Sequence, residues 1–330
     1  MDDIVSREDP DDLSSNVMFT FTDGVGRCAQ NIADQAAKDL GFDDHDVHRH
    51  PSAIQFRLGG AKGVLCAWPG VKPREIFLRP SQIKFESESK KLHVVRISQF
   101  RKAFLNRQFC ILFAALGVDP EVIKGLIWNK AKSIIGLAER VGARRLTRKD
   151  LWMIDKVSSF PLAALINAGF HKDPVVLDVC TVTERRMLAD LRWHARVEVD
   201  KGVYLMGVAD ESGLLEEGQV FCQYHDPEQE DGPVIVKGDC AITRAPALHP
   251  GDIRKVQAVD CPALHSLVNV IVFNVKGVRD LPNMLGGGDL DGRLDHGTGT
   301  SSHLLNQAPF DRRRLHLYLG RAFRQASQRS

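Results

Sequence analysis

The sequence predicts an α+β fold in which two β-rich modules are joined by a helical segment. Three observations predict it: short apolar runs between Gly, Pro and Asp turns fill residues 18–100, helical apolar spacing follows over 101–193, and short runs return over 194–292. Strands, then helices, then strands suit two separate β modules, because an alternating α/β sheet would interleave its strands and helices.

The first module is expected over residues 18–100. Its strand candidates include Ile54–Leu58 and Leu92–Ile97, and one helix is expected from about residue 29 to residue 40. Residues 1–17 are rich in acids and poor in apolar side chains. We therefore expect them to form a flexible acidic leader.

The connecting segment, residues 101–193, carries apolar side chains at three- and four-residue spacing. One helix is expected to start at Asp119, an N-cap residue, because Pro120 suits the first helical turn. Residues 101–156 hold twelve Lys or Arg against five acids. This basic segment could face a polyanion, and the alternative is a set of solvated helix faces.

The second module, residues 194–292, is expected to return to strands bounded by polar turns. Its strand candidates are Val203–Val208, Gln219–Tyr224, Pro233–Val236, Cys240–Thr243 and Val268–Phe273. Residues 293–330 differ in composition, with seven Arg, no Lys and two acids among many Ser, Gly and His. We expect a divergent tail without regular structure.

Composition places the chain among ordinary globular proteins, since 43% of the residues are hydrophobic and 26% are charged. The acidic start lacks the pattern of a secretory signal, and the longest strongly apolar run, Phe109–Val118, is too short to span a bilayer. Seven cysteines without a C-x-x-C pair predict free thiols in a reducing compartment. An intracellular protein is expected, with nuclear or cytoplasmic residence left open.

The strongest chemical motif is the glycine-rich run Gly286–Gly292, which contains Asp289 and Asp291. Carboxylates two residues apart, among glycines that permit sharp turns, can converge on one hard cation. An EF-hand is excluded because Arg293 and Leu294 occupy positions that its loop needs for other residues. A phosphatase of the haloacid dehalogenase type is disfavoured by the three preceding glycines, and a plain polar turn remains the alternative.

A second group of possible metal ligands precedes Pro51. It consists of His45, His48 and His50 with Asp43, Asp44 and Asp46. A polar loop is the favoured interpretation of this stretch. The sequence contains no P-loop, H-E-x-x-H or G-x-S-x-G arrangement.

Seven motif blocks, in order along the chain, resemble the eukaryotic cellular RNA-directed RNA polymerases of gene silencing, in particular those of fungi. The resemblance covers roughly residues 18–292 and ends in Gly-Asp-Leu-Asp-Gly. It corresponds to only part of a polymerase chain of this family. The blocks are Phe21–Gly26, Pro51–Arg57, Gly59–Gly63, Leu78–Ser81, Phe104–Gln108, Gly213–Phe221 and Thr243–Asp252.

The resemblance implies that each β module is a double-psi β-barrel. It also implies that Asp289 and Asp291 are catalytic and hold Mg²⁺ for two-metal nucleotidyl transfer, and that Arg57, Lys62 and Lys84 bind the nucleotide phosphates. The implied partners are an RNA template, ribonucleoside triphosphates and proteins of the silencing pathway, with no membrane.

One departure from the family pattern concerns the metal loop, because Arg293 stands where the family has a third Asp. A cation beside a divalent ion replaces attraction by repulsion, so we expect a truncated or impaired copy of the polymerase. Two further hypotheses remain open. One is a catalytically dead fragment that binds RNA, and the other is a magnesium-dependent phosphohydrolase that uses the two aspartates.

Overall fold

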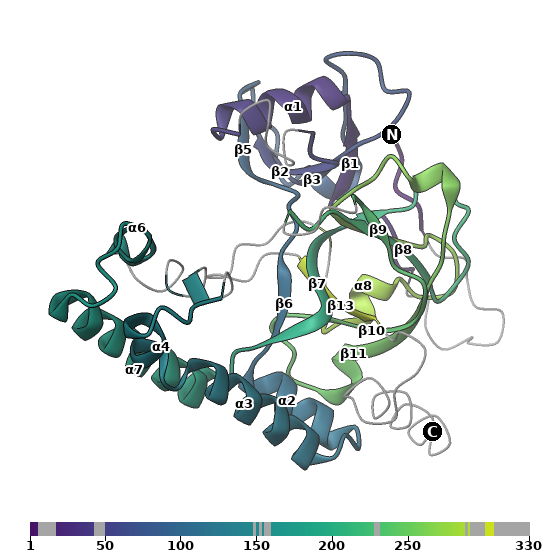
Figure 1. Ribbon diagram of the computed structural model, residues 1–330. Coiled ribbons are helices and arrows are strands. Elements are labelled where there is room, and N and C mark those ends of the chain that lie inside the picture. The colour runs from purple at the N-terminus through teal and green to yellow at the C-terminus, as the bar shows by residue number, and fades with distance from the viewer. Residues whose placement is uncertain are drawn as a thin grey trace. The chain divides into compact units, whose positions relative to one another are not determined.

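The protein is represented by a computed structural model (Figure 1). It describes residues 1–5, 18–42, 50–147, 150–151, 154, 160–227, 232–287, 290 and 301–306. The chain divides into two compact units. Residues 1–103 and 199–312 belong to the first, which contains both β modules, and residues 104–198 belong to the second.

The first β module is a five-stranded sheet with strand order β4-β1-β3-β2-β5. β1 runs parallel to β3, and the neighbouring pairs β1–β4, β3–β2 and β2–β5 are antiparallel. The strands are β1 Val25–Cys28, β2 Ala53–Leu58, β3 Ala61–Ala67, β4 Ile76–Phe77 and β5 Leu92–Ile97.

One face of this sheet is covered by α1, Gln30–Asp39, as Figure 1 shows. The helix turns its alanines Ala33, Ala36 and Ala37 inward, where they pack with Ile54 and Phe56 in a small apolar core. Because alanine side chains are short, the helix can lie close to the strands. The opposite face of the sheet is thereby left to contact the second module.

The second β module is an eight-stranded sheet that closes on itself. Six of its strands form a ring in the order β11-β10-β13-β7-β12-β8, and a parallel pairing of β8 with β11 completes it. β6 and β9 extend the sheet from β7 and β8. The strands are β6 Lys102–Leu105, β7 Val197–Ala209, β8 Gln219–Tyr224, β9 Val234–Ile235, β10 Gly238–Arg244, β11 Ile253–Ala258, β12 Val270–Phe273 and β13 Ser301–Asn306.

The two β modules share one apolar core. Val25, Val64 and Cys66 of the first sheet are buried together with Val208 and Val272 of the second. Burial of aliphatic side chains on this scale stabilises a fold by about 1.5–3 kcal/mol for each one. The two β modules therefore pack directly against each other.

The helical unit is built around one long helix, α7, Pro174–His194. α3, α4 and α6 all contact it. The other helices are α2 Arg107–Ala115, α3 Pro120–Ile134, α4 Leu137–Gly142 and α6 Leu162–Asn167. Asp119 caps α3 as predicted, since its carboxylate accepts a hydrogen bond of 2.9 Å from the amide of Glu121.

Most of the predicted helices and strands are present, and three expectations differ from the structure. Residues 102–105, expected to be helical, form β6, whose pairing with β7 decides its conformation. Residues 301–306 of the tail form β13 between β7 and β10. Residues 1–5 of the expected flexible leader contact the first module, where the carboxylate of Asp3 accepts a hydrogen bond of 2.9 Å from the Ser81 amide. Each difference depends on a partner distant in sequence.

All seven cysteines are free, which confirms the prediction of free thiols. Burial raises the pKa of the Cys28 thiol to about 12. Among the described helices, none combines the length and apolar character that a membrane span needs.

Candidate active site

The acidic motif follows a short helix, α8, Leu281–Met284, in the second module. Asp289 and Asp291, the predicted catalytic and metal-binding residues, lie outside the described residues, as does Arg293. Leu290, between the two aspartates, is described and lies in the shared core with 3% of its surface exposed. Leu290 is therefore anchored in the core between the two predicted metal ligands.

A backbone hydrogen bond joins the motif to the first module. The amide of Leu290 donates to the carbonyl of Asp23 over 3.2 Å. The next carbonyl, that of Gly24, accepts from the amide of Val64 over 2.8 Å. The neighbouring residues Asp23 and Gly24 therefore link Leu290 to β3, Ala61–Ala67, through one hydrogen bond each.

Two of the three predicted phosphate-binding residues face each other across a hairpin. Arg57 of β2 and Lys62 of β3 are directly opposite partners in the antiparallel register. Side chains of directly opposite residues leave the same face of a sheet. Arg57 is exposed and Lys62 is half-buried, so the pair concentrates positive charge at one end of the hairpin.

Lys84, the third predicted phosphate-binding residue, lies beside the same hairpin. Its amide donates to the carbonyl of Gly60 over 2.9 Å, and its exposed side chain donates to the carbonyl of Ser81 over 2.7 Å. A Cβ atom at Gly60 would stand 1.6 Å from the carbonyl oxygen of Phe85. The glycine therefore permits the approach that brings Lys84 to the hairpin.

Gln82 is a site residue that sequence reasoning missed. Its side chain is completely buried, and its amide group donates to the carbonyls of Gly24 and Val64, each over 3.1 Å. Its side-chain oxygen accepts from the amide of Arg79 over 3.0 Å. Gln82 thus ties the Phe21–Gly26 and Leu78–Ser81 blocks to Val64 of β3, and its position directly after the Leu78–Ser81 block was the available signal.

A buried ion pair is a second feature that sequence reasoning missed. Arg79 of the first module and Glu211 of the second are 2.6 Å apart, with 1% and 5% of their side chains exposed. Arg79 also donates through Nε to the carbonyl of Val25 over 2.9 Å and through Nη1 to the carbonyl of Asp2. Arg79 belongs to the Leu78–Ser81 block, so sequence analysis identified the motif but not the ion pair that Arg79 makes with Glu211.

The described part of the chain contains no group of three or more His, Cys, Asp or Glu able to hold a metal. Of the second group of possible ligands, only His50 is described, and its Nδ1 lies 3.0 Å from the carboxylate of Asp34. The other five residues of that group lie outside the described residues.

Comparison with known proteins decides the family. Residues 1–294 match the model of the family described as RNA dependent RNA polymerase. The chain belongs to the RNA-dependent RNA polymerase family. The family assignment covers the Asp-Leu-Asp-Gly motif and every block from which the resemblance was inferred.

Members of this RNA-dependent RNA polymerase family resemble the chain in sequence and in structure. RNA-dependent RNA polymerase 1 of Arabidopsis thaliana is 33% identical over 297 residues, which are 89% of this chain and 26% of that protein. RNA-dependent RNA polymerase 1 of Schizosaccharomyces pombe is 35% identical over 317 residues, 86% of this chain and 25% of that protein. The solved RNA dependent RNA polymerase QDE-1 from Thielavia terrestris superimposes with a TM-score of 0.73 at 25% identity, covering 93% of this chain and 35% of that one.

The chain thus spans about a quarter of the length of these curated relatives. The structural likeness confirms a mixed α+β fold with two sheets.

Proposed function

We propose that the chain is the part of an RNA-directed RNA polymerase of the gene-silencing type that carries the nucleotidyl-transfer centre. One observation carries the proposal beyond family membership: Leu290 of the acidic motif donates to the carbonyl of Asp23, and the carbonyl of the next residue, Gly24, accepts from Val64 of β3, the strand that carries Lys62. We further propose that each β module is a double-psi β-barrel. The closed six-stranded ring supports this for the second module.

The donor chemistry of the acidic motif suits Mg²⁺ in part. Asp289 and Asp291 supply carboxylate oxygens, the ligands that Mg²⁺ prefers, whereas Arg293 supplies none. When bound, the metal would activate a 3′ hydroxyl and neutralise the departing pyrophosphate.

The chain's own residues would hold the nucleotide. Arg57 and Lys62, which leave the same face of the hairpin, would bind its phosphates together with Lys84. Three cations around a triphosphate offset its charge as that charge moves to the leaving group. The RNA template and ribonucleoside triphosphates are the proposed partners, with proteins of the silencing pathway as further ones, in an intracellular setting.

The test measures template-directed incorporation of ribonucleotides and Mg²⁺ affinity for the chain and for Arg293→Asp. We expect the unmodified chain to incorporate poorly or not at all. The variant should bind Mg²⁺ at least tenfold more tightly, since one charge pair at about 4 Å is worth roughly 4 kcal/mol at an effective dielectric of about 20. Lys124→Asp, an equal charge change at an exposed helical position, is the control.

The outcomes separate the proposal from its alternatives. Efficient incorporation by the unmodified chain that Asp291→Ala abolishes would confirm the polymerase and show that Arg293 is tolerated. RNA binding that weakens with salt, without incorporation by either version, would indicate a catalytically dead RNA-binding fragment. Release of phosphate from small esters, lost in Asp289→Ala, would indicate a magnesium-dependent phosphohydrolase.

A further inference from the structure

An open hollow lies in the β-rich unit. It is lined by Arg96, Ile97, Ser98, Gln99, Arg101, Tyr204 and Met206. The chain supplies the first five from the end of β5 and the stretch before β6, and the last two from β7.

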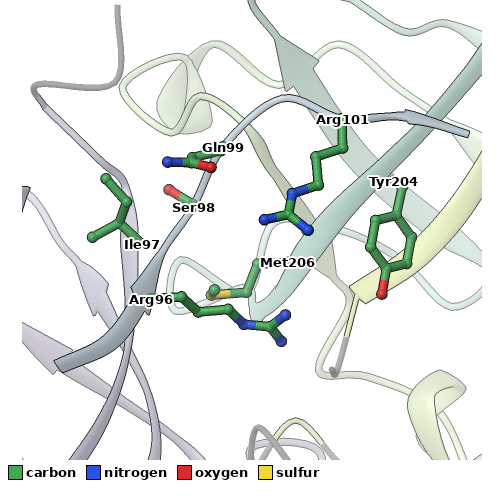
Figure 2. A pocket seen from close by; sticks show the side chains of 7 residues that line it. All are labelled: Arg96, Ile97, Ser98, Gln99, Arg101, Tyr204 and Met206. Atoms are coloured by element: carbon green, nitrogen blue, oxygen red, sulfur yellow. The ribbon is translucent and has the colours of Figure 1, made fainter. Parts of the chain in front are cut away.

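The side chains of the hollow divide into two sets (Figure 2). The guanidinium groups of Arg96 and Arg101 and the ring of Tyr204 turn toward the same space, whereas Ile97 and Gln99 point away from it. The backbone fixes this arrangement, because the amide of Tyr204 donates to the carbonyl of Arg101 over 2.7 Å. Two cations and a phenol therefore converge on one space, from β5, from the stretch before β6 and from β7.

An irregularity in the first sheet directs Arg96 into this space. β2 and β5 change register between Gln55, which pairs with Arg96, and Phe56, which pairs with Val94. The extra residue, Val95, is a β-bulge of the kind that redirects a neighbouring side chain. Arg96 thus shares the face of Gln55, which is the face turned away from α1 and its apolar core.

The Arg96 side chain is not satisfied by the protein groups around it. Its Nε and Nη2 atoms are buried, and neither has a hydrogen-bond partner among the described residues. Burial, with the charge of Arg101, lowers the pKa of Arg96, while Tyr204 acts in the opposite direction. A buried N–H group without an acceptor is unfavourable, and arginine cannot shed its proton in a protein to avoid this.

We propose that Arg96, Arg101 and Tyr204 form a binding site for one phosphate group. The guanidinium fork matches the oxygens of a phosphate, with which it makes two parallel charge-assisted hydrogen bonds. A phosphate would satisfy the two buried N–H groups of Arg96 and separate the two guanidinium charges. The phosphate could belong to the backbone of RNA or be the terminal phosphate of a small molecule.

The experiment is calorimetric titration of the full chain at constant ionic strength in chloride. The two probes are inorganic phosphate and a ribotrinucleotide without terminal phosphates. The variants are Arg96→Gln and Arg101→Gln, and Arg254→Gln, an exposed arginine on β11, is the matched control. We expect each site variant to weaken binding by roughly tenfold or more, because hydrogen bonds to charged groups are lost, and the control to bind as the unmodified chain does.

The two probes identify the source of the phosphate. Arginine-dependent binding of inorganic phosphate alone indicates a terminal phosphate, and arginine-dependent binding of the trinucleotide indicates a phosphodiester of RNA. Failure of both probes to bind the unmodified chain, or unchanged affinity in the two site variants, would overturn the proposal. If Arg96→Gln does not fold, Arg101→Gln decides, because Arg101 is exposed and its loss should abolish any rise in unfolding temperature with phosphate.

Discussion

Asp280 is a carboxylate whose buried position disfavours its charged form. It caps α8 by accepting a hydrogen bond of 2.9 Å from the amide of Asn283, yet only 6% of its surface is exposed. Burial raises its pKa to about 6, and the negative charge of Asp23 contributes in the same direction. The hydrogen bond of the cap therefore stabilises the start of α8, whereas the buried negative charge of Asp280 destabilises the folded protein.

The pH dependence follows from the direction of this shift. Because the folded protein holds the Asp280 proton more tightly than the unfolded chain, the contribution of Asp280 to stability falls as pH rises from about 4 to about 6 and stays low above that. Asp280→Asn keeps a capping oxygen and removes the charge. We expect the variant to gain about 1–2 kcal/mol over the unmodified chain at pH 7.5 and to lose this gain at pH 4. Chemical unfolding at both pH values measures it, and a gain independent of pH would contradict it.

At the scale of single elements, β3 depends on a glycine for its contact with the loop that precedes β1. A Cβ atom at Gly63 would stand 2.2 Å from the carbonyl oxygen of Gly24, which is backbone and cannot easily move. That same oxygen accepts the amide of Val64, so relief of the clash would break the contact. β3 and the loop can therefore form this hydrogen bond because Gly63 has no side chain.

We expect Gly63→Ala to destabilise the protein by roughly 1–3 kcal/mol, as overpacking does in a close-packed interior. Gly125→Ala is the matched control, since Gly125 lies inside α3 and a Cβ there meets nothing within 4 Å. That control should raise stability by roughly 0.5–1 kcal/mol, through the helix propensity of alanine. Denaturant unfolding measures the change in the free energy of unfolding for both variants. Equal changes would show that the close contact between Gly63 and the Gly24 carbonyl does not constrain the fold.

At the scale of the whole molecule, the buried pair of Arg79 and Glu211 joins the two β modules. Removal of one partner from a buried pair leaves the other charge uncompensated. We expect Arg79→Met to cost about 3 kcal/mol, at the low end for such pairs because Arg27 remains 4.0 Å from Glu211. The double variant with Glu211→Gln should cost less than the sum of the two single changes, which a double-mutant cycle measures.

The control for this prediction is an exposed ion pair of the same length. Lys124 and Glu121 are also 2.6 Å apart, but 69% and 73% of their side chains are exposed. Lys124→Met should therefore change stability by less than about 1 kcal/mol. If Arg79→Met costs no more than Lys124→Met, the buried pair does not hold the modules together.

The sequence by itself determined the order of elements and the family. Local patterns suffice for that: the Asp119 cap and Pro120 start α3, and the predicted strands Leu92–Ile97 and Gln219–Tyr224 coincide with β5 and β8. The motif blocks likewise needed only their order along the chain, and the family comparison agrees with them. The roles of Asp289 and Asp291 remain predictions.

Only the tertiary structure decided which residues meet. The partners of Gln82 and Arg79 lie on other strands and on the other module, and β13 exists through its pairing with β7 and β10. The convergence of Arg96 with Arg101 needs a bulge and a strand from the second module. Neither composition nor periodicity records such contacts, because hydrogen bonds and buried charges between distant segments depend on the packing of the folded chain.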